Sequence, residues 1–233
     1  MKVGILQCDS VLIEYQAEFA DYPHMLMQMF AAVTNELEYQ VYNVVDNEYP
    51  GNLNECDVYI TTGSKVSVYD NLAWIDVLKQ FICDLDRNQK KLVGICFGHQ
   101  LVADALNGKT QASAKGWGVG LSKNKITMKK NWMLPSLDAL RIIVSHKDQV
   151  LELPTGAELL ATSEFCPHFM YQMGKHIMCV QGHPEFSFDY SATLMTHRRK
   201  LLGESVYQAG INSLQLKSDA RVFAQWIVQF FKN

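Results

Sequence analysis

The chain has 233 residues, of which 48% are hydrophobic and 19% charged, and its formal net charge is −3. A chain of this length can bury one good-sized core, most simply as a single α/β domain over residues 1–233. The small negative charge gives no basic surface for nucleic acid and no polybasic patch for a membrane, so neither partner is expected.

The N-terminus does not have the pattern of a targeting segment. Residues 1–10 read MKVGILQCDS, an apolar run too short and too interrupted for a signal peptide or a spanning helix. The six cysteines form no C-x-x-C pair, which favours free thiols in a reducing compartment over a zinc site. We therefore expect a cytoplasmic protein with no metal and no cofactor.

The first half of the chain alternates apolar strand-like runs with helical patterns. The expected strands are 2–8, 41–45, 58–60 and 92–95, and the expected helices are 23–33, 74–85 and 101–108. A polar loop is expected at 9–21. This alternation predicts a parallel sheet with helices on both faces, in which sites lie beyond the carboxyl ends of the strands.

The second half of the chain favours shorter strands and then helices. Strand-like segments are expected around Gly118 and Gly120 and at 123–130, 141–144, 158–162, 169–172 and 177–180. Helices are expected at 190–202 and 222–231. We expect the C-terminal helices, residues 188–233, to pack on the domain, with the last one docking on the sheet or burying a homodimer surface.

Cys96 lies at a tight bend between an apolar run and a helical pattern. Gly94 and Gly98 flank it in GICFGHQ, and glycines on either side of a nucleophile let a strand turn sharply into a helix. A sulfur at a helix N-terminus is favoured as the thiolate, because free N–H groups and the positive end of the dipole lie beside it. Cysteine is more often a small buried hydrophobe, which is the expectation for the other five. The bend predicts that Cys96 is a nucleophile.

GICFGHQ at 94–100 resembles the nucleophile elbow of class I glutamine amidotransferases, which hydrolyse the side-chain amide of glutamine. The resemblance calls for a downstream histidine and carboxylate, and GHPEF at 182–186 follows in the family's order. His183 and Glu185 are two residues apart, so on a continuous strand both side chains would project to one face. His183 is then the expected base for Cys96, and Glu185 the group that orients it.

The resemblance also implies a fold and further site residues. The implied fold is a three-layer, flavodoxin-like, mostly parallel sheet with a small antiparallel β extension. An oxyanion would be held by the N–H groups of Gly63, which follows a predicted strand, and of Phe97. The further implied substrate contacts are Ser64, Gln100, His146 and Asp148.

Additional motifs resemble the stand-alone, GMP synthase-like members of the family, including the γ-glutamyl peptidases. They are DYP at 21–23, TGSKVSVYD at 62–70, Trp74 and KGWGVG at 115–120. GMP synthase continues into an ATP pyrophosphatase domain with a Ser-Gly-Gly nucleotide loop; residues 1–233 contain no such loop, and we do not expect a complete synthetase. We expect a hydrolase that cleaves the γ-glutamyl amide of glutamine; either a separate synthase subunit accepts the ammonia, or the protein hydrolyses γ-glutamyl bonds outright.

Two alternatives remain open. A γ-glutamyl peptidase would use the same residues and differ only in the leaving group. A non-catalytic regulatory or binding subunit would keep the fold without turnover, but the intact cysteine, histidine and carboxylate argue against it.

Overall fold

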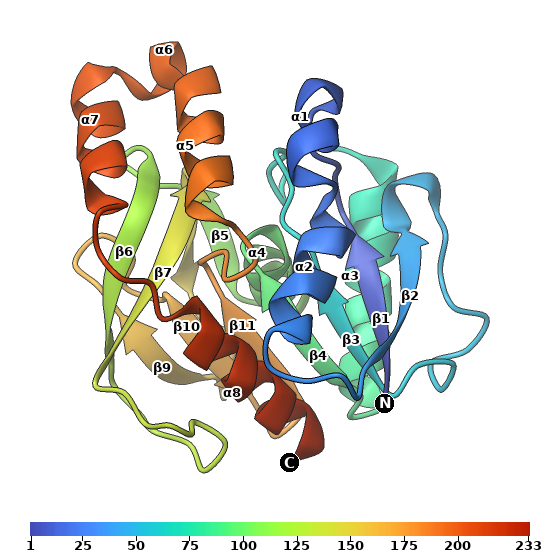
Figure 1. Ribbon diagram of the computed structural model, residues 1–233. Helices are drawn as coiled ribbons and strands as arrows, with labels where there is room; N and C mark the ends of the chain where they lie inside the picture. The colour runs from blue at the N-terminus through green and yellow to red at the C-terminus, as the bar shows by residue number, and fades with distance from the viewer.

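Nine strands form one sheet in the computed structural model, which describes residues 1–233 (Figure 1). In sheet order they are β2 (Glu38–Asn43), β1 (Lys2–Gln7), β3 (Val58–Thr61), β4 (Lys91–Ile95), β11 (Ile177–Val180), β10 (Met170–Met173), β9 (Glu158–Thr162), β6 (Gly118–Ile126) and β7 (Ala139–His146). The first five are parallel and the last four extend the sheet antiparallel. A second, two-stranded antiparallel sheet pairs β5 (Lys109–Ala112) with β8 (Asp148–Glu152).

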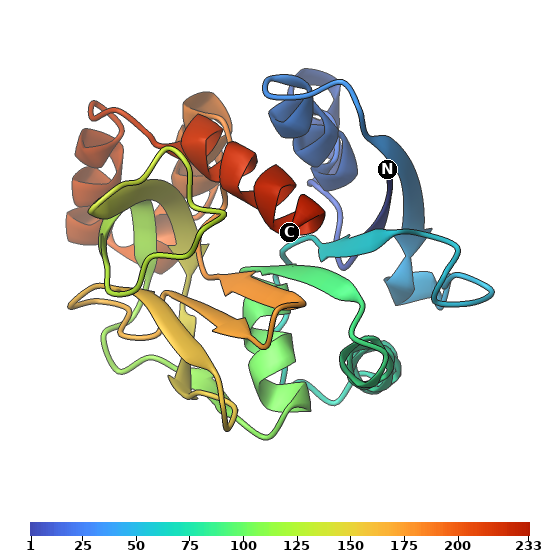
Figure 2. The same cartoon turned by 90° about the horizontal axis from the view of Figure 1, so that it is seen from below.

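Helices cover both faces of the nine-stranded sheet (Figure 2). The helices α2 (Tyr22–Ala31) and α8 (Ala220–Lys232) lie on one face, and α3 (Ala73–Arg87) and α4 (Phe97–Ala105) lie on the other. At one end of the molecule lie α1 (Ile13–Phe19), α5 (Phe188–His197), α6 (Arg199–Leu202) and α7 (Glu204–Ser213). The predicted α/β fold, with a mostly parallel sheet and an antiparallel extension, is confirmed.

The central strands contribute side chains to two hydrophobic cores, because successive side chains of a strand point to opposite faces of the sheet. In β4, Val93 and Ile95 pack in the core shared with α2 and α8, whereas Leu92 packs in the core shared with α3 and α4. Trp226 of α8 is fully buried in the first core. A strand buried on both faces has no polar alternation, which is why the predicted central strands read as continuous apolar runs.

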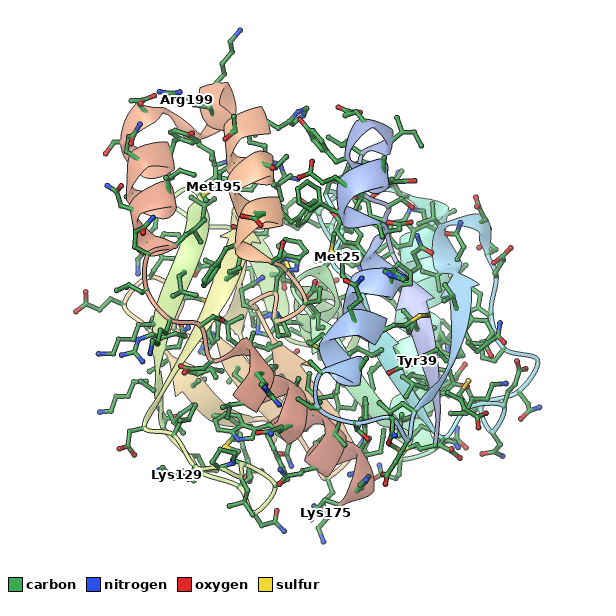
Figure 3. The ribbon with its side chains drawn as sticks, viewed as in Figure 1. Met25, Tyr39, Lys129, Lys175, Met195 and Arg199 are labelled. Atoms are coloured by element: carbon green, nitrogen blue, oxygen red, sulfur yellow. The ribbon has the colours of Figure 1, made fainter.

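A third, smaller apolar cluster joins α2 to α5 near the end of the sheet. Met25 of α2 faces α5 (Figure 3) and belongs to one cluster with Tyr190 and Leu194. The Tyr22 and Tyr190 hydroxyls are 3.0 Å apart. These contacts fix α5 beside the loop that follows β11. None of the helices has the length and apolar composition needed to cross a lipid bilayer.

Several predicted boundaries are wrong, for identifiable reasons. The predicted loop 9–21 contains α1, none of whose residues is fully buried and in which only Tyr15 and Phe19 pack on an apolar cluster, so its helical pattern is weak. The predicted strand 41–45 lies at Glu38–Asn43 instead, because pairing with β1 sets its register and Val44–Asp46 forms a 3₁₀ turn. The predicted helix 190–202 is divided at Arg198.

Three further elements of the structure have no counterpart among the predicted ones. The short strands β5 and β8 expose several of their residues, and α7 buries only Gly210. The residues buried in these elements are mostly polar or glycine, so the elements have weak hydrophobic periodicity.

Candidate active site

Cys96 connects β4 to α4 in a strained backbone conformation. Its φ and ψ are 49° and −96°, a combination that a non-glycine residue rarely adopts and that clusters at functional sites. The turn brings α4 very close to the sheet. A Cβ on Gly98 would lie 1.7 Å from Oγ1 of Thr61, and one on Gly94 would lie 2.9 Å from the Gly98 carbonyl. Both flanking glycines are therefore required by packing.

We expect Gly98→Ala to destabilise the protein by about 1–3 kcal/mol, because the added methyl must displace Thr61. The Thr61 hydroxyl accepts a hydrogen bond from the Ile95 N–H, so the displacement also disturbs the strand that leads to Cys96. Chemical denaturation measures the change. Gly51→Ala is the matched control, since the nearest atom to its new Cβ is 3.8 Å away. Equal stability of the two variants would contradict this account of the elbow.

The segments that follow three neighbouring parallel strands meet at one edge of the sheet. Gly63 follows β3, Cys96 follows β4 and His183 follows β11, and these strands are adjacent in the order β3-β4-β11. Gly63 lies against the imidazole, since a Cβ there would be 2.6 Å from Cε1 of His183. The structure therefore brings together residues that are distant in sequence at the expected edge of the sheet.

His183 is buried and held on three sides. Its Nδ1 is 2.7 Å from Oε1 of Glu185, and its ring stacks on Phe186 with centroids 4.0 Å apart. Cys96 is its other charged neighbour, close enough for the charge of the sulfur to act on the ring. Burial disfavours the imidazolium, but the charges of Cys96 and Glu185 outweigh burial and raise the pKa of His183.

His183 and Glu185 lie side by side for a different reason from the predicted one. β11 ends at Val180, so His183 and Glu185 lie in the following turn and not on one face of a continuous strand. The turn is anchored by the His183 N–H, which donates to the Ile143 carbonyl at 2.7 Å.

Gln181 is a site residue that the sequence motifs alone do not reveal. It is fully buried, and its Nε2 lies 3.5 Å from Sγ of Cys96. Its Oε1 accepts a hydrogen bond from Nε2 of Gln100 at 3.0 Å, and that amide also donates to the Asp148 carbonyl at 2.9 Å. Gln181 directly precedes the GHPEF motif, and that position is the one signal of its role in the sequence.

The remaining predicted contacts gather around one polar hollow with Cys96 in its wall. Ser64, Gln100, His146 and Asp148 all line this hollow, which has an empty volume of about 480 Å³. The Asp148 carboxylate accepts hydrogen bonds from the hydroxyls of Ser67 and Tyr69. No backbone acceptor pairs with the Gly63 or Ser64 N–H, and the first N–H groups of α4 have no partner within the helix. No three His, Cys, Asp or Glu side chains are grouped so that they could hold a metal ion.

Two buried histidines beside the site make stability depend on pH. Burial lowers the pKa of His99 to about 3 and that of His146 to about 4, whereas an unfolded histidine titrates near 6.5. Between these values the unfolded chain binds more protons, so stability falls as pH falls. We expect a loss of about 2–4 kcal/mol between about pH 7 and pH 5 from the two groups together.

Denaturation at a series of pH values checks this expectation. His99→Gln should roughly halve the slope of stability against pH, whatever it does to stability at neutral pH. His24→Gln is the control, because His24 is exposed. The pKa of His183 is raised, in the opposite direction, so His183 affects stability only above about pH 6.5. There the stability that the protonated His183 contributes is lost as pH rises. A slope unchanged by His99→Gln would show that His99 does not cause it.

Comparison with known proteins identifies the family. The family model for class I glutamine amidotransferases matches residues 20–199 of this chain, which include Cys96, His183 and Glu185. The chain belongs to the class I glutamine amidotransferases.

The relatives within the family are named for different activities. γ-Glutamyl peptidase 3 of Arabidopsis thaliana is 33% identical over 189 residues, which cover 77% of this chain and 74% of the relative. A glutamine amidotransferase-like protein of Schizosaccharomyces pombe is 27% identical over 98% of this chain and 97% of the relative. The glutamine-hydrolysing GMP synthase subunit of Methanosphaera stadtmanae is 34% identical over 46% of this chain and 56% of the relative. These relatives support a hydrolase-type activity.

Solved structures share the fold of this amidotransferase over its whole length. A glutamine amidotransferase from Thermotoga maritima superposes with a TM-score of 0.80, covering 99% of each chain at 17% identity. At that identity the likeness concerns the fold alone.

Proposed function

We propose that this amidotransferase hydrolyses γ-glutamyl amide bonds through a covalent thioester on Cys96. The observation that carries the proposal is the buried His183, whose pKa is raised by the charges of Cys96 and Glu185 and whose Nδ1 lies 2.7 Å from Oε1 of Glu185. A nucleophile, a base and a carboxylate that orients the base are the parts needed for acyl transfer.

The first half of the reaction forms the thioester. His183 holds the proton of Cys96, and the thiolate attacks the γ-carbonyl carbon of the substrate. The tetrahedral intermediate then collapses as the carbon–nitrogen bond breaks, and the imidazolium gives its proton to the departing nitrogen. Glu185 stabilises the imidazolium without taking up the proton.

The second half releases glutamate. Water enters where the nitrogen departed, His183 takes its proton, and the resulting hydroxide attacks the thioester carbonyl. The carbon–sulfur bond breaks and the sulfur leaves as the thiolate. Gln181, with Nε2 at 3.5 Å, lies where it can donate to that thiolate and hold it in position.

The oxyanion is assigned to backbone N–H groups from two loops. The Gly63 N–H has no backbone acceptor, and the Phe97 N–H lies at the start of α4. The Phe97 N–H is fixed by α4, and Gly63 follows β3 in a segment that packs against His183. Donors held in place before substrate binds are effective in the transition state. Each is expected to contribute about 3 kcal/mol. The Ser64 N–H is the neighbouring option.

The polar hollow beside Cys96 is assigned to the glutamyl head group. The Asp148 carboxylate, oriented by Ser67 and Tyr69, suits the α-ammonium group of the substrate. Gln100 holds Asp148 and Gln181 in place through its amide, and Ser64 and His146 complete the wall. Both hydrogen bonds that the Gln100 Nε2 can donate are used by these neighbours. Gln100 therefore positions Asp148 and Gln181 and forms part of the wall of the hollow.

Two leaving groups are consistent with this chemistry. Ammonia from glutamine would pass to a separate synthase subunit, as the relation to the archaeal GMP synthase subunit suggests. An amine from a γ-glutamyl peptide would simply be released, and the 33% identity to γ-glutamyl peptidase 3 favours this second activity.

A substrate profile tests the proposal. The purified protein is incubated with glutamine, glutathione and γ-glutamyl dipeptides, and released glutamate, ammonia and amine are measured by mass spectrometry. We expect glutamate from at least one γ-glutamyl compound and none from the corresponding α-linked isomers. Failure of every γ-glutamyl compound would contradict the proposal.

A further inference from the structure

A second, smaller hollow lies on the imidazole side of the site. Gly63 and His183 line it, together with Ser145. It opens to solvent, and its empty volume of about 270 Å³ includes part of that open space. Cys96 lines the larger hollow but not this one. In the proposed mechanism His183 protonates the departing nitrogen, so that nitrogen must face the imidazole. A leaving group larger than ammonia would therefore extend past the residues of this hollow toward the solvent.

Arg198 extends from the break between α5 and α6 to the junction of the two hollows and lines both. Its Nη1 donates to the Ser145 hydroxyl at 3.1 Å, and its guanidinium lies 5.6 Å from the centre of the Trp117 ring. These partners are neutral. The neighbouring Arg199, at the outer end of the same helices (Figure 3), is instead paired with Glu204. Arg198 thus carries a part-buried positive charge without a carboxylate partner beside the site.

The other cation at this hollow is already paired. Lys65 lines the smaller hollow, but its Nζ lies 2.9 Å from Oδ1 of Asp9, whose side chain is only 12% exposed. Phe186 and Leu194 add apolar wall. The unmatched charge in the hollow is therefore that of Arg198, and a guanidinium binds a planar carboxylate with two parallel hydrogen bonds.

We propose that Arg198 binds the carboxylate of the leaving group, so that the preferred substrates are γ-glutamyl dipeptides that release a free amino acid. This inference rests on the proposed function and specifies its leaving group. Glutamine and neutral γ-glutamyl amides offer no carboxylate on that side and lose this contact. Arg198 is then a specificity-determining residue, and a leaving amino acid is held with its nitrogen toward His183.

Paired substrates isolate the carboxylate. γ-Glutamylglycine and γ-glutamylglycinamide differ only in the charge at the end of the leaving group. For each substrate, kcat/KM is measured with the wild-type protein and with Arg198→Met. We expect the loss for γ-glutamylglycine to be about tenfold to a hundredfold greater than the loss for the glycinamide. Comparing losses cancels the different intrinsic reactivities of the two amines.

Two more variants separate charge from structure. Arg198→Lys keeps the charge without the bidentate geometry and should restore part of the preference. Lys200→Met removes a nearby exposed cation that lines neither hollow and should keep the wild-type preference.

A binding measurement makes the inference independent of turnover. Calorimetric titration with the same two ligands is carried out in a Cys96→Ala background. Arg198→Met should raise the Kd of γ-glutamylglycine by a factor at least about tenfold greater than the factor by which it raises the Kd of the glycinamide. Equal losses for the two ligands would overturn the inference, because Arg198 would then hold the glutamyl head or act structurally, while hydrolysis would stand. Arg198-dependent binding without cleavage by the wild-type protein would support the inference and overturn the proposed function. Absence of binding to either ligand would overturn the inference as well.

Discussion

Replacing Cys96 with serine is expected to lower kcat by at least about 10⁴-fold, with little change in the fold. Serine occupies nearly the same space, so the strained turn at φ 49° and its contacts with α4 are kept. The hydroxyl, however, is a far weaker nucleophile than the thiolate that His183 and Gln181 are placed to stabilise. Steady-state release of glutamate from the best γ-glutamyl substrate measures the loss.

The matched control is Cys83→Ser. Cys83 lies on α3 and its sulfur donates to the Ala105 carbonyl, away from both hollows. This variant should retain activity and remain reactive at Cys96 toward a γ-glutamyl-directed electrophile. Retention of more than about a tenth of wild-type activity by Cys96→Ser would show that another group is the nucleophile.

Glu185→Gln is expected to lower kcat by about 10³- to 10⁴-fold while leaving substrate binding nearly unchanged. The amide can keep the contact with Nδ1 of His183, now 2.7 Å, but it carries no charge to stabilise the imidazolium. Glu185 is one of the groups that raise the pKa of His183, so its loss should lower that pKa. The basic limb of the pH–rate profile should therefore move to lower pH.

Asp189→Asn is the control for this change. Asp189 lies four residues further on, is exposed in the first turn of α5, and removing its charge tests for a general electrostatic effect. It should change kcat less than about threefold and leave the pH profile in place. A pH profile for Glu185→Gln identical to that of the wild type would contradict the assigned role of Glu185.

The central parallel strands could be predicted because they are buried on both faces. The predicted strand at 177–180 has the observed bounds of β11, and the run before Cys96 corresponds to β4 within one residue. Elements held mainly by tertiary contacts could not be predicted. The helix α1 buries no residue, and α7 packs through Gly210, which lies against Met195.

The part of the candidate site that could be predicted is the part that lies in the two sequence motifs. The segments containing Cys96 and His183 could be assigned to one edge of a sheet from their positions after strands. Arg198 could not, because a basic run at 197–200 has the pattern of a solvated helix face. Arg198 lies at the break between α5 and α6 and packs over Trp117, whereas Arg199 forms an ion pair with Glu204 at the surface. Whether residues 1–233 act as one domain, and whether α8 supports a homodimer, stay predictions.

The covalent intermediate is the central claim, and rapid-quench mass spectrometry tests it most directly. The wild-type protein is mixed with a γ-glutamyl substrate, quenched in acid within milliseconds to seconds, digested and mapped. The account predicts a transient adduct with the mass of one glutamyl group on the peptide that contains Cys96, formed in a burst and accumulating in step with the first released amine. Turnover without any adduct on that peptide, or with the adduct on another residue, would contradict it.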